Sequence, residues 1–338
     1  MDQLLKRIPP LLLDWYDGAA RVLPWRSEPT PYRVWVSEIM LQQTRVEAVK
    51  PYFDRFLNAL PTVQALAAAP EETVLKLWEG LGYYSRARNL HKAAKMICEE
   101  FGGELPSEKA ELLRLPGIGS YTAGAVASIA FNQKLPAVDG NVLRVISRVL
   151  ASRQDITSAE VKKAMERALQ EIIPERAGDF NQSLMELGAT VCLPNGAPLC
   201  LLCPLYGLCR AAEEGIQDEI PVKTPKKPRK IERRTVFVLW NDGRLAIRRR
   251  PKKGLLAGLW ELPNCISDEQ DEVLREWGIA PEQLAPIGTA KHIFTHIEWH
   301  MQGVSAQTEE IGGMTWVTPQ ELAEQYTIPN AFRAFLPK

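Results

Sequence analysis

The sequence lacks long hydrophobic runs, and it lacks an excess of charge of either sign. No stretch approaches the roughly 20 consecutive apolar residues that a membrane span requires. Residues 8–13 contain two prolines and are followed by Asp14, which is not the pattern of a signal peptide. Lysine and arginine together number 41, as do aspartate and glutamate, so any contact with phosphate depends on local basic clusters. We expect a cytoplasmic protein without a membrane partner.

Cysteine is scarce, and most of it lies in one short segment. Four of the six cysteines are spaced C-x7-C-x2-C-x5-C, and these are Cys192, Cys200, Cys203 and Cys209. In a reducing compartment, such density favours metal ligation over disulfides. Zinc and an iron–sulfur cluster both accept four thiolates, so the spacing alone leaves the metal open. Cys98 and Cys265 stand apart, and we expect them in the core as small apolar residues.

The N-terminal part of the chain has apolar residues at three- and four-residue spacing, which predicts amphipathic helices. The segments with this spacing are 31–42, 45–59, 70–79, 85–101, 107–114, 120–131, 140–151, 158–172 and 177–191. Residues of the types that cap helix N-termini precede several of them. The expected caps are Thr44, Ser107, Asp139 and Ser158.

The composition changes after residue 212. Residues 213–231 mix prolines with lysines and have no hydrophobic period, which predicts an extended basic linker. Beyond it we expect strands at 235–240, 244–250, 297–305 and 314–317, and helices at 268–277 and 319–326. The sequence therefore predicts a mainly helical region over 1–212 and a separate α+β domain over 232–338.

A glycine-bearing turn, Leu-Pro-Gly-Ile-Gly at 115–119, joins two of the predicted helices. Gly117 and Gly119 allow a tight turn whose amide N–H groups suit a phosphate, although a plain helix–helix turn also fits these residues. Asp139 follows twenty residues after Gly119. We expect the helix N-terminus to keep this carboxylate ionised, so that it can stabilise an oxocarbenium ion; capping alone is the alternative.

These features together resemble the endonuclease III superfamily of DNA glycosylases. Residues 34–44 (Val-Trp-Val-Ser-Glu-Ile-Met-Leu-Gln-Gln-Thr) and 78–86 (Trp-Glu-Gly-Leu-Gly-Tyr-Tyr-Ser-Arg) closely resemble adenine DNA glycosylases of the MutY type. The similarity covers most of residues 10–210. It implies a helix-hairpin-helix glycosylase with a six-helix barrel and a [4Fe–4S] cluster on the four clustered cysteines. That family usually has six residues between the first two cysteines, whereas this chain has seven, in the loop 193–199.

Cleaving a purine N-glycosidic bond requires an acid for the departing base and an anion for the developing sugar cation. Glu38 sits among apolar residues of its predicted helix, where desolvation would raise its pKa, although a place at the helix edge is the alternative. The resemblance implies that Glu38 protonates adenine N7 and that Asp139 stabilises the oxocarbenium ion or a covalent intermediate. It further implies that Tyr121 hydrogen-bonds this pair and that Asn141 orients the water. Bifunctional relatives carry a lysine where this chain has Tyr121, so efficient β-lyase activity is not expected.

The resemblance also assigns residues to an extruded adenine and the gap it leaves. It implies that Gln43 and Tyr83 wedge the gap in the duplex. Trp25, Arg26 and Gln182 are implied to form the adenine pocket. Ordinary core positions are the alternative for the two aromatic residues.

The C-terminal domain resembles the Nudix-related lesion-recognition domain of the same family. Residues 269–278 lack the paired glutamates of a Nudix hydrolase, so pyrophosphatase activity is not expected. Phe294, Thr295 and His296 match the family's Phe-Ser-His loop, with threonine in place of serine. The Thr295 hydroxyl oxygen can accept the N7 hydrogen that distinguishes 8-oxoguanine from guanine. The alternative is that these residues simply end a strand.

We therefore expect a monomeric, monofunctional glycosylase that removes adenine mispaired with 8-oxoguanine or guanine in double-stranded DNA and leaves an abasic site. Its expected location is a bacterial-type cytoplasm, where it acts on the nucleoid. One alternative is an endonuclease III-like glycosylase and lyase that acts on oxidised pyrimidines. The other is a non-catalytic iron–sulfur protein that binds DNA.

Overall fold

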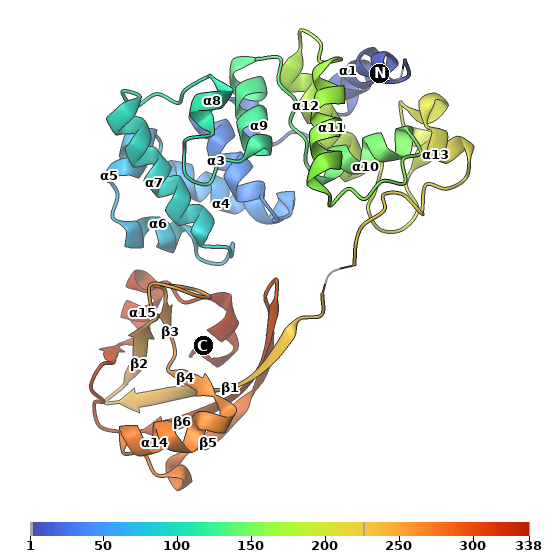
Figure 1. Ribbon diagram of the computed structural model, residues 1–338. Coiled ribbons are helices and arrows are strands. Elements are labelled where there is room, and N and C mark those ends of the chain that lie inside the picture. Colours follow the sequence, from blue (N-terminus) through green and yellow to red (C-terminus); the bar gives the residue numbers. More distant parts are fainter. Residues whose placement is uncertain (1–2, 226, 338) are drawn as a thin grey trace. The chain divides into compact units, whose positions relative to one another are not determined.

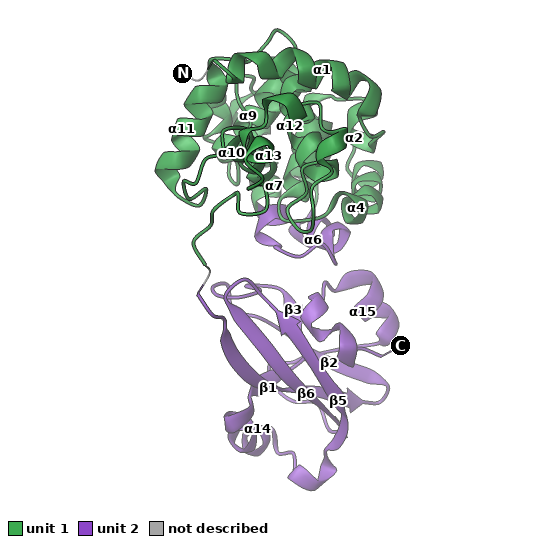
Figure 2. Ribbon diagram, turned by 90° about the vertical axis from the view of Figure 1, so that its right-hand side faces the viewer, with its two compact units in different colours: residues 1–69, 89–225 green, residues 70–88, 226–338 purple. Residues whose placement is uncertain are grey.

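The computed structural model describes residues 3–225 and 227–337, and the chain divides into two compact units (Figures 1 and 2). Unit 1 comprises residues 1–69 and 89–225, and unit 2 comprises residues 70–88 and 226–338. Among the described residues, no helix has the length and apolar character needed to cross a bilayer.

Unit 1 is built from helices. Their bounds are α1 Ile8–Ala19, α2 Pro24–Ser27, α3 Pro31–Leu41, α4 Val46–Ala59, α5 Val63–Ala68, α8 Lys109–Leu112, α9 Ser120–Phe131, α10 Gly140–Val149, α11 Ala159–Gln170, α12 Ala177–Thr190 and α13 Arg210–Glu213. Helix α7, Ser85–Glu100, begins in unit 2 and continues into unit 1. One core of unit 1 lies among α1, α10, α11 and α12, where Leu12, Ile146 and Phe180 are fully buried.

Helix α1 was not among the predicted helices. Its first turn contains Pro9, and proline is tolerated there because the first amide groups of a helix have no intrahelical acceptor. Ile8, Leu12 and Tyr16 recur at four-residue spacing and are buried, so packing of this face holds the helix.

The predicted caps are only partly correct. Asp139 caps α10, and its side chain accepts a hydrogen bond from Val142 N. The N-caps of α4 and α8 are Arg45 and Glu108, each one residue after the predicted Thr44 and Ser107. Ser158 precedes α11 as predicted, but its hydroxyl donates to Glu160 and leaves the helix amides without a side-chain cap.

Unit 2 contains a mixed sheet with the strand order β3-β2-β1-β6-β5, and β4 and β7 pair with β1 and β2 respectively. The bounds are β1 Lys230–Asn241, β2 Arg244–Arg249, β3 Trp260–Glu261, β4 Asn264–Ile266, β5 Ala285–Ile293, β6 Ile297–Gln307 and β7 Thr315–Val317. The central strands β1 and β6 run parallel, and every other pair is antiparallel. Strands β3, β4 and β5 were not predicted, and β1 begins within the stretch expected to be linker.

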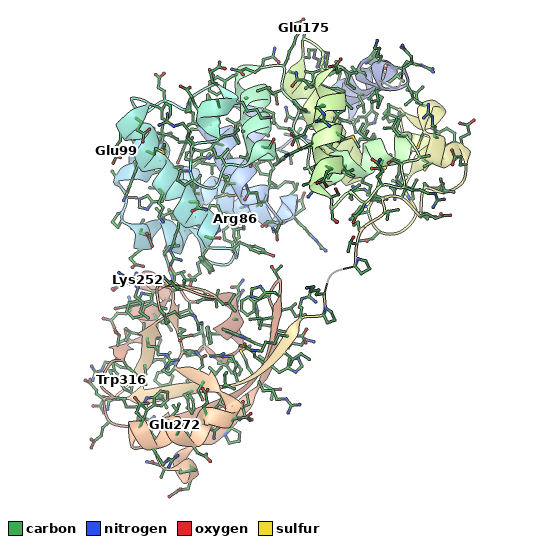
Figure 3. All side chains as sticks on the ribbon, viewed as in Figure 1. Arg86, Glu99, Glu175, Lys252, Glu272 and Trp316 are labelled. Carbon is green, nitrogen blue, oxygen red and sulfur yellow. The ribbon has the colours of Figure 1, made fainter. Side chains whose placement is uncertain are left out.

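Alternate residues of β1 serve two cores, one on each face of the sheet. Val236 and Val238 pack with Leu322 of α15, Pro319–Gln325. Phe237 packs with Leu274 of α14, Gln270–Trp277, on the other face. Trp316 of β7 packs against this second core (Figure 3). Unit 2 also contains α6, Glu71–Trp78.

Candidate active site

A cavity of about 640 Å³ in unit 1 brings together residues from α3, α9, α10 and α12. This volume is within the range of roughly 300–1,000 Å³ found for small-molecule sites. Nine of the predicted site residues line the cavity, namely Trp25, Arg26, Glu38, Gln43, Gly119, Tyr121, Asp139, Asn141 and Gln182. Residues more than a hundred positions apart in the sequence, such as Glu38 and Asp139, thus line the same cavity.

Glu38 is buried, with 6% of its surface exposed, and it projects from α3. Tyr121, the second residue of α9, donates its hydroxyl to Glu38 Oε2 at 2.7 Å. Burial raises the pKa of Glu38 to about 7, although the Tyr121 hydrogen bond opposes this and the nearby Asp139 charge adds to it. The pKa of Tyr121 is raised well above its usual value by burial, so the phenol remains a donor. Glu38 can therefore hold a proton near neutral pH.

Asp139 lies at the start of α10 and accepts hydrogen bonds on both oxygens. Val142 N donates to Oδ1 at 2.8 Å, and Asn141 Nδ2 donates to Oδ2 at 2.7 Å. Asn141 Oδ1 in turn accepts from Arg144 at 2.9 Å, so both ends of the Asn141 amide are fixed. These donors favour a carboxylate at 139, whereas the Glu38 carboxyl accepts from a single phenol.

Burial of Asp139 opposes the effect of these donors, which favour the ionised form expected from the sequence. The pKa of Asp139 is raised, because burial outweighs the hydrogen bonds from Val142 and Asn141. Helix position can be read from the sequence, but the depth at which a helix N-terminus is buried in a cavity wall cannot.

A buried ion-pair cluster forms another part of the cavity wall. Glu186 of α12 is only 1% exposed, and it accepts from Arg26 Nη2 at 2.8 Å and from Arg21 Nη2 at 3.0 Å. Arg26 Nε also donates to Gln182 Oε1 at 3.1 Å. Because a guanidinium group has only donors, the Gln182 amide must turn its oxygen toward Arg26 and keep its NH₂ for other partners.

Glu186 and Arg21 were missed in the sequence. Glu186 follows Gln182 by four residues on one helix, a spacing that places both side chains on the same face. That spacing could have indicated Glu186. The position of Arg21 could not be inferred in this way, because 165 residues separate it from Glu186.

The two residues that the resemblance assigns to wedging the duplex both have left-handed backbone conformations. Gln43 has a φ of 57° and Tyr83 has a φ of 48°. Such conformations cost non-glycine residues on the order of 1–3 kcal/mol and cluster at functional sites. Tyr83 is 47% exposed, and Gln43 is also exposed, so neither is an ordinary core residue. Trp25, in contrast, is buried and packs edge-to-face on Phe53 at 5.4 Å while lining the cavity.

The glycine-bearing turn lies between α8 and α9. Gly117 has a φ of 81°, and an added Cβ would lie 2.8 Å from Asn89 Cβ, so the turn requires glycine there. Gly119 has a φ of −99°, which any residue adopts, and it is the N-cap of α9. Only one of the two glycines is therefore needed for the turn itself.

Phe294, Thr295 and His296 lie in unit 2, at the turn between β5 and β6. Phe294 N donates to Ile297 O at 2.8 Å and closes this turn. Thr295 and His296 are exposed at its tip. The Tyr83 hydroxyl, also in unit 2, lies 3.4 Å from the Thr295 hydroxyl.

The four clustered cysteines all line one small cavity next to Arg148. Arg148 Nη1 donates to Cys192 Sγ at 3.1 Å. Among residues 3–225 and 227–337, no three histidine, cysteine or acidic side chains meet closely enough to hold a single metal ion. Of the two separate cysteines, Cys265 is buried as expected, whereas Cys98 is only half-buried.

Comparison with known proteins defines the class of the chain. Residues 36–174 match the family of HhH-GPD superfamily base excision DNA repair proteins, and residues 235–338 match the NUDIX domain. Among solved structures, a thermostable thymine-DNA glycosylase aligns with a TM-score of 0.57 and 29% identity, covering 62% of this chain and 97% of that one. A trapped endonuclease III–DNA covalent intermediate aligns with a TM-score of 0.55 and 27% identity, covering 64% and 99%. The chain is a helix-hairpin-helix glycosylase of base excision repair with a Nudix-like domain, which confirms the expected fold class.

Relatives that align over nearly the whole chain identify the family within that class. The adenine DNA glycosylase of Homo sapiens is 37% identical over 96% of this chain and 73% of its own length. That of Mus musculus is 38% identical over 92% of this chain and 73% of its own length. The chain belongs to the adenine DNA glycosylase family.

Proposed function

We propose that this chain removes adenine mispaired with 8-oxoguanine or guanine from double-stranded DNA, with Glu38 as the acid and Asp139 as the anion. The observation that carries this proposal is that a buried carboxyl group, Glu38, and a half-buried one, Asp139, line one cavity and have different partners. Glu38 accepts from one phenol and has a pKa raised to about 7, whereas amide donors surround Asp139. Pairs of carboxyl groups with different environments divide acid and anion roles in glycoside cleavage.

In this mechanism the Glu38 proton passes to adenine N7 as the bond between N9 and C1′ breaks. Tyr121 keeps the Glu38 carboxyl oriented toward the cavity. The Asp139 carboxylate offsets the positive charge that develops on the sugar, either electrostatically or by bonding to C1′. Asn141, fixed between Asp139 and Arg144, orients the water whose oxygen bonds to C1′, and any bond between Asp139 and C1′ breaks in this step. The Glu38 carboxylate takes up the proton that the water loses, which leaves an abasic site and restores the acid.

The remaining predicted residues have roles in DNA binding. Trp25, Arg26 and Gln182 are proposed to receive the extruded adenine, since all three line the cavity. Gln43 and Tyr83 fill the gap in the duplex, and the amide groups near Gly117 and Gly119 contact phosphate. Thr295 accepts the N7 hydrogen of 8-oxoguanine, with Phe294 and His296 beside it. The chain is proposed to act as a monomer, with its domains divided at 1–212, 213–231 and 232–338.

We also propose that Cys192, Cys200, Cys203 and Cys209 hold a [4Fe–4S] cluster. The support is their common cavity, the arginine donor on Cys192 Sγ and membership of a family related to endonuclease III. When bound, the cluster would cross-link the segment between α12 and α13 and so stabilise its fold. A brown protein with about four irons per chain is expected, and a colourless zinc protein would contradict the proposal.

The test of the glycosylase is single-turnover release of adenine from duplexes that pair A with 8-oxoguanine, G, C or T. Release should be fastest opposite 8-oxoguanine and should leave an intact strand with an abasic site. Borohydride trapping tests the lyase alternative, because a Schiff base would be captured as a covalent adduct. A strong adduct, or cleavage of oxidised pyrimidines instead of adenine, would overturn the proposal.

A further inference from the structure

The turn between β5 and β6 is anchored by an aromatic contact beneath it. Phe294 precedes the exposed tip residues Thr295 and His296, and its ring meets Trp299 of β6 at 4.9 Å and 71°, edge to face. Trp299 is only 1% exposed. The position of the Thr295 hydroxyl therefore depends on where Trp299 holds the neighbouring Phe294 ring.

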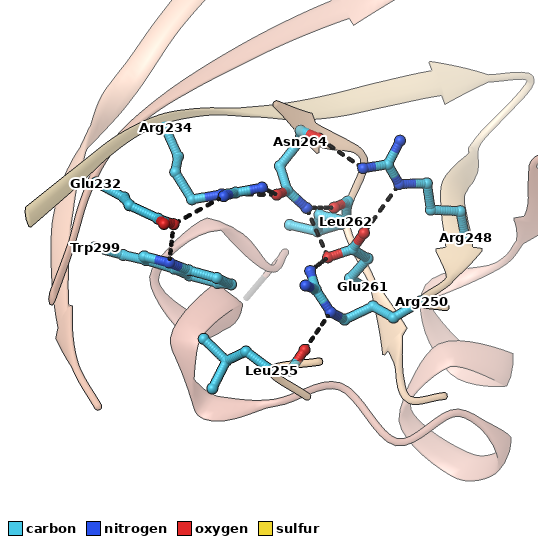
Figure 4. A network of polar contacts seen from close by, with 9 residues as sticks. All are labelled: Glu232, Arg234, Arg248, Arg250, Leu255, Glu261, Leu262, Asn264 and Trp299. Atoms are coloured by element: carbon cyan, nitrogen blue, oxygen red, sulfur yellow. Dashed lines mark hydrogen bonds and ion pairs between the residues drawn. The ribbon is translucent and has the colours of Figure 1, made fainter. Parts of the chain in front are cut away.

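Trp299 is fixed by polar groups as well as by packing (Figure 4). Its Nε1 donates to Glu232 Oε2 at 3.0 Å. The Arg234 guanidinium carbon lies 4.6 Å from the Trp299 ring centroid, and that of Arg250 lies 5.7 Å away. Cations at such distances attract the ring face. One hydrogen bond and two cations thus restrict both the tilt and the rotation of the indole.

The two arginines are in turn held by acceptors. Arg234 Nη2 donates to Asn264 Oδ1 at 2.7 Å, and Arg234 Nη1 lies 3.3 Å from Glu232 (Figure 4). Arg250 pairs with Glu261, which is 2% exposed. Burying such charges contributes little net stability and often costs some, so a network of this kind is better explained by the geometry it fixes.

We propose that Trp299 is a positioning residue for lesion recognition, holding Phe294 so that the Thr295 hydroxyl meets N7 of 8-oxoguanine. This inference rests on the proposed function. A hydrogen bond weakens steeply once its distance and angle leave a narrow range, so a small displacement of Phe294 is enough to reduce discrimination. Neither Trp299 nor Arg234 lines the adenine cavity, and adenine release opposite guanine should not depend on them.

The test replaces Trp299 by phenylalanine, which keeps an aromatic ring but removes the Glu232 hydrogen bond. Trp316→Phe is the matched control, since Trp316 packs against the core on the other face of the sheet. The readout is the ratio of single-turnover adenine release opposite 8-oxoguanine to that opposite guanine, with enzyme in excess over the duplex but below saturation. Trp299→Phe should lower this ratio by at least about threefold, the scale of one aromatic contact, with release opposite guanine unchanged. Trp316→Phe should leave both the ratio and the release opposite guanine unchanged.

A second pair of variants covers the case in which Trp299→Phe does not fold. Arg234→Leu removes the nearer cation from the ring and should also lower the ratio, whereas Arg234→Lys keeps a cation and should recover part of it. If the wild-type protein shows no preference for 8-oxoguanine, the proposed function fails. If the wild type shows the preference and the folded variants retain it in full, the role of Trp299 is overturned.

Discussion

The Tyr121 hydroxyl donates to Glu38 Oε2 at 2.7 Å, inside the cavity that Asp139 also lines. This bond favours the ionised form of Glu38 and so limits the rise in its pKa, which burial brings to about 7. The phenol thus both orients the acid and sets the pH at which it loses its proton.

The first prediction concerns the pH profile of Tyr121→Phe. The protonated form of Glu38 is the active one, so single-turnover adenine release should fall as the pH rises through about 7. Removing the phenol removes a donor to the carboxylate, which raises the pKa of Glu38 further. The alkaline limb of the profile should therefore move to higher pH in Tyr121→Phe, even if the maximal rate drops. A limb that stays in place or moves to lower pH would contradict the assignment of Glu38 as the acid.

The second prediction concerns Glu38→Gln. Loss of a general acid should lower single-turnover adenine release by about 10²-fold or more, with binding of the mismatched duplex retained. Glu47→Gln, an exposed carboxyl group on α4, is the matched control and should release adenine at the wild-type rate. Equal rates for wild type and Glu38→Gln would favour a non-catalytic DNA-binding protein.

The same substitution has a pH-dependent effect on stability. The pKa of Glu38 is raised in the folded state, so between about 4.5 and 7 the unfolded chain loses a proton that the folded chain keeps. Glu38 therefore lowers the free energy of unfolding as the pH rises through this window. Glutamine does not titrate and therefore does not contribute this loss. As the pH rises from 5 to 8, the free energy of unfolding of Glu38→Gln should increase by about 2 kcal/mol relative to that of the wild type. Urea unfolding at the two pH values measures this gain, and a constant difference would argue against a raised pKa.

A fourth prediction separates the charge of Asp139 from its capping role. Asparagine caps helices about as well as aspartate, so Asp139→Asn should unfold at nearly the wild-type temperature. Adenine release should nevertheless fall by about 10²-fold or more, because the anion beneath the sugar cation is lost. Asp54→Asn, on the exposed face of α4, should alter neither property. If Asp139→Asn released adenine at the wild-type rate, residue 139 would act only as a helix cap and not as the anion.

The sequence predicted the helices from α3 onward, except the short α5 and α13, and nine residues of the cavity, from periodicity, local motifs and resemblance. It did not predict α1, because two prolines in the first turn argue against a helix. Packing of the buried face of α1 stabilises the helix nevertheless, and a local pattern does not record that packing. Strand β5 was missed for a related reason, because nearly all of its residues are exposed and hydrogen bonds to β6 define it. The raised pKa of Asp139 and the pairing of Arg21 with Glu186 depend on depth and on distant neighbours, neither of which a local pattern records.

The last prediction concerns Glu186, whose carboxylate is buried between two arginines. Breaking a buried pair leaves an uncompensated charge and typically costs 3–5 kcal/mol, so Glu186→Gln should lower the free energy of unfolding by about 3 kcal/mol. Asp17→Asn removes a carboxylate that pairs with an arginine at the surface, where solvent screens the attraction, so it should cost clearly less stability than Glu186→Gln. Because Arg26 also holds Gln182, Glu186→Gln should weaken adenine release in conditions where the protein is still folded. Urea unfolding and single-turnover assays on the same preparations test both effects, and similar stability losses for the two variants would show that Glu186 is not a buried anchor.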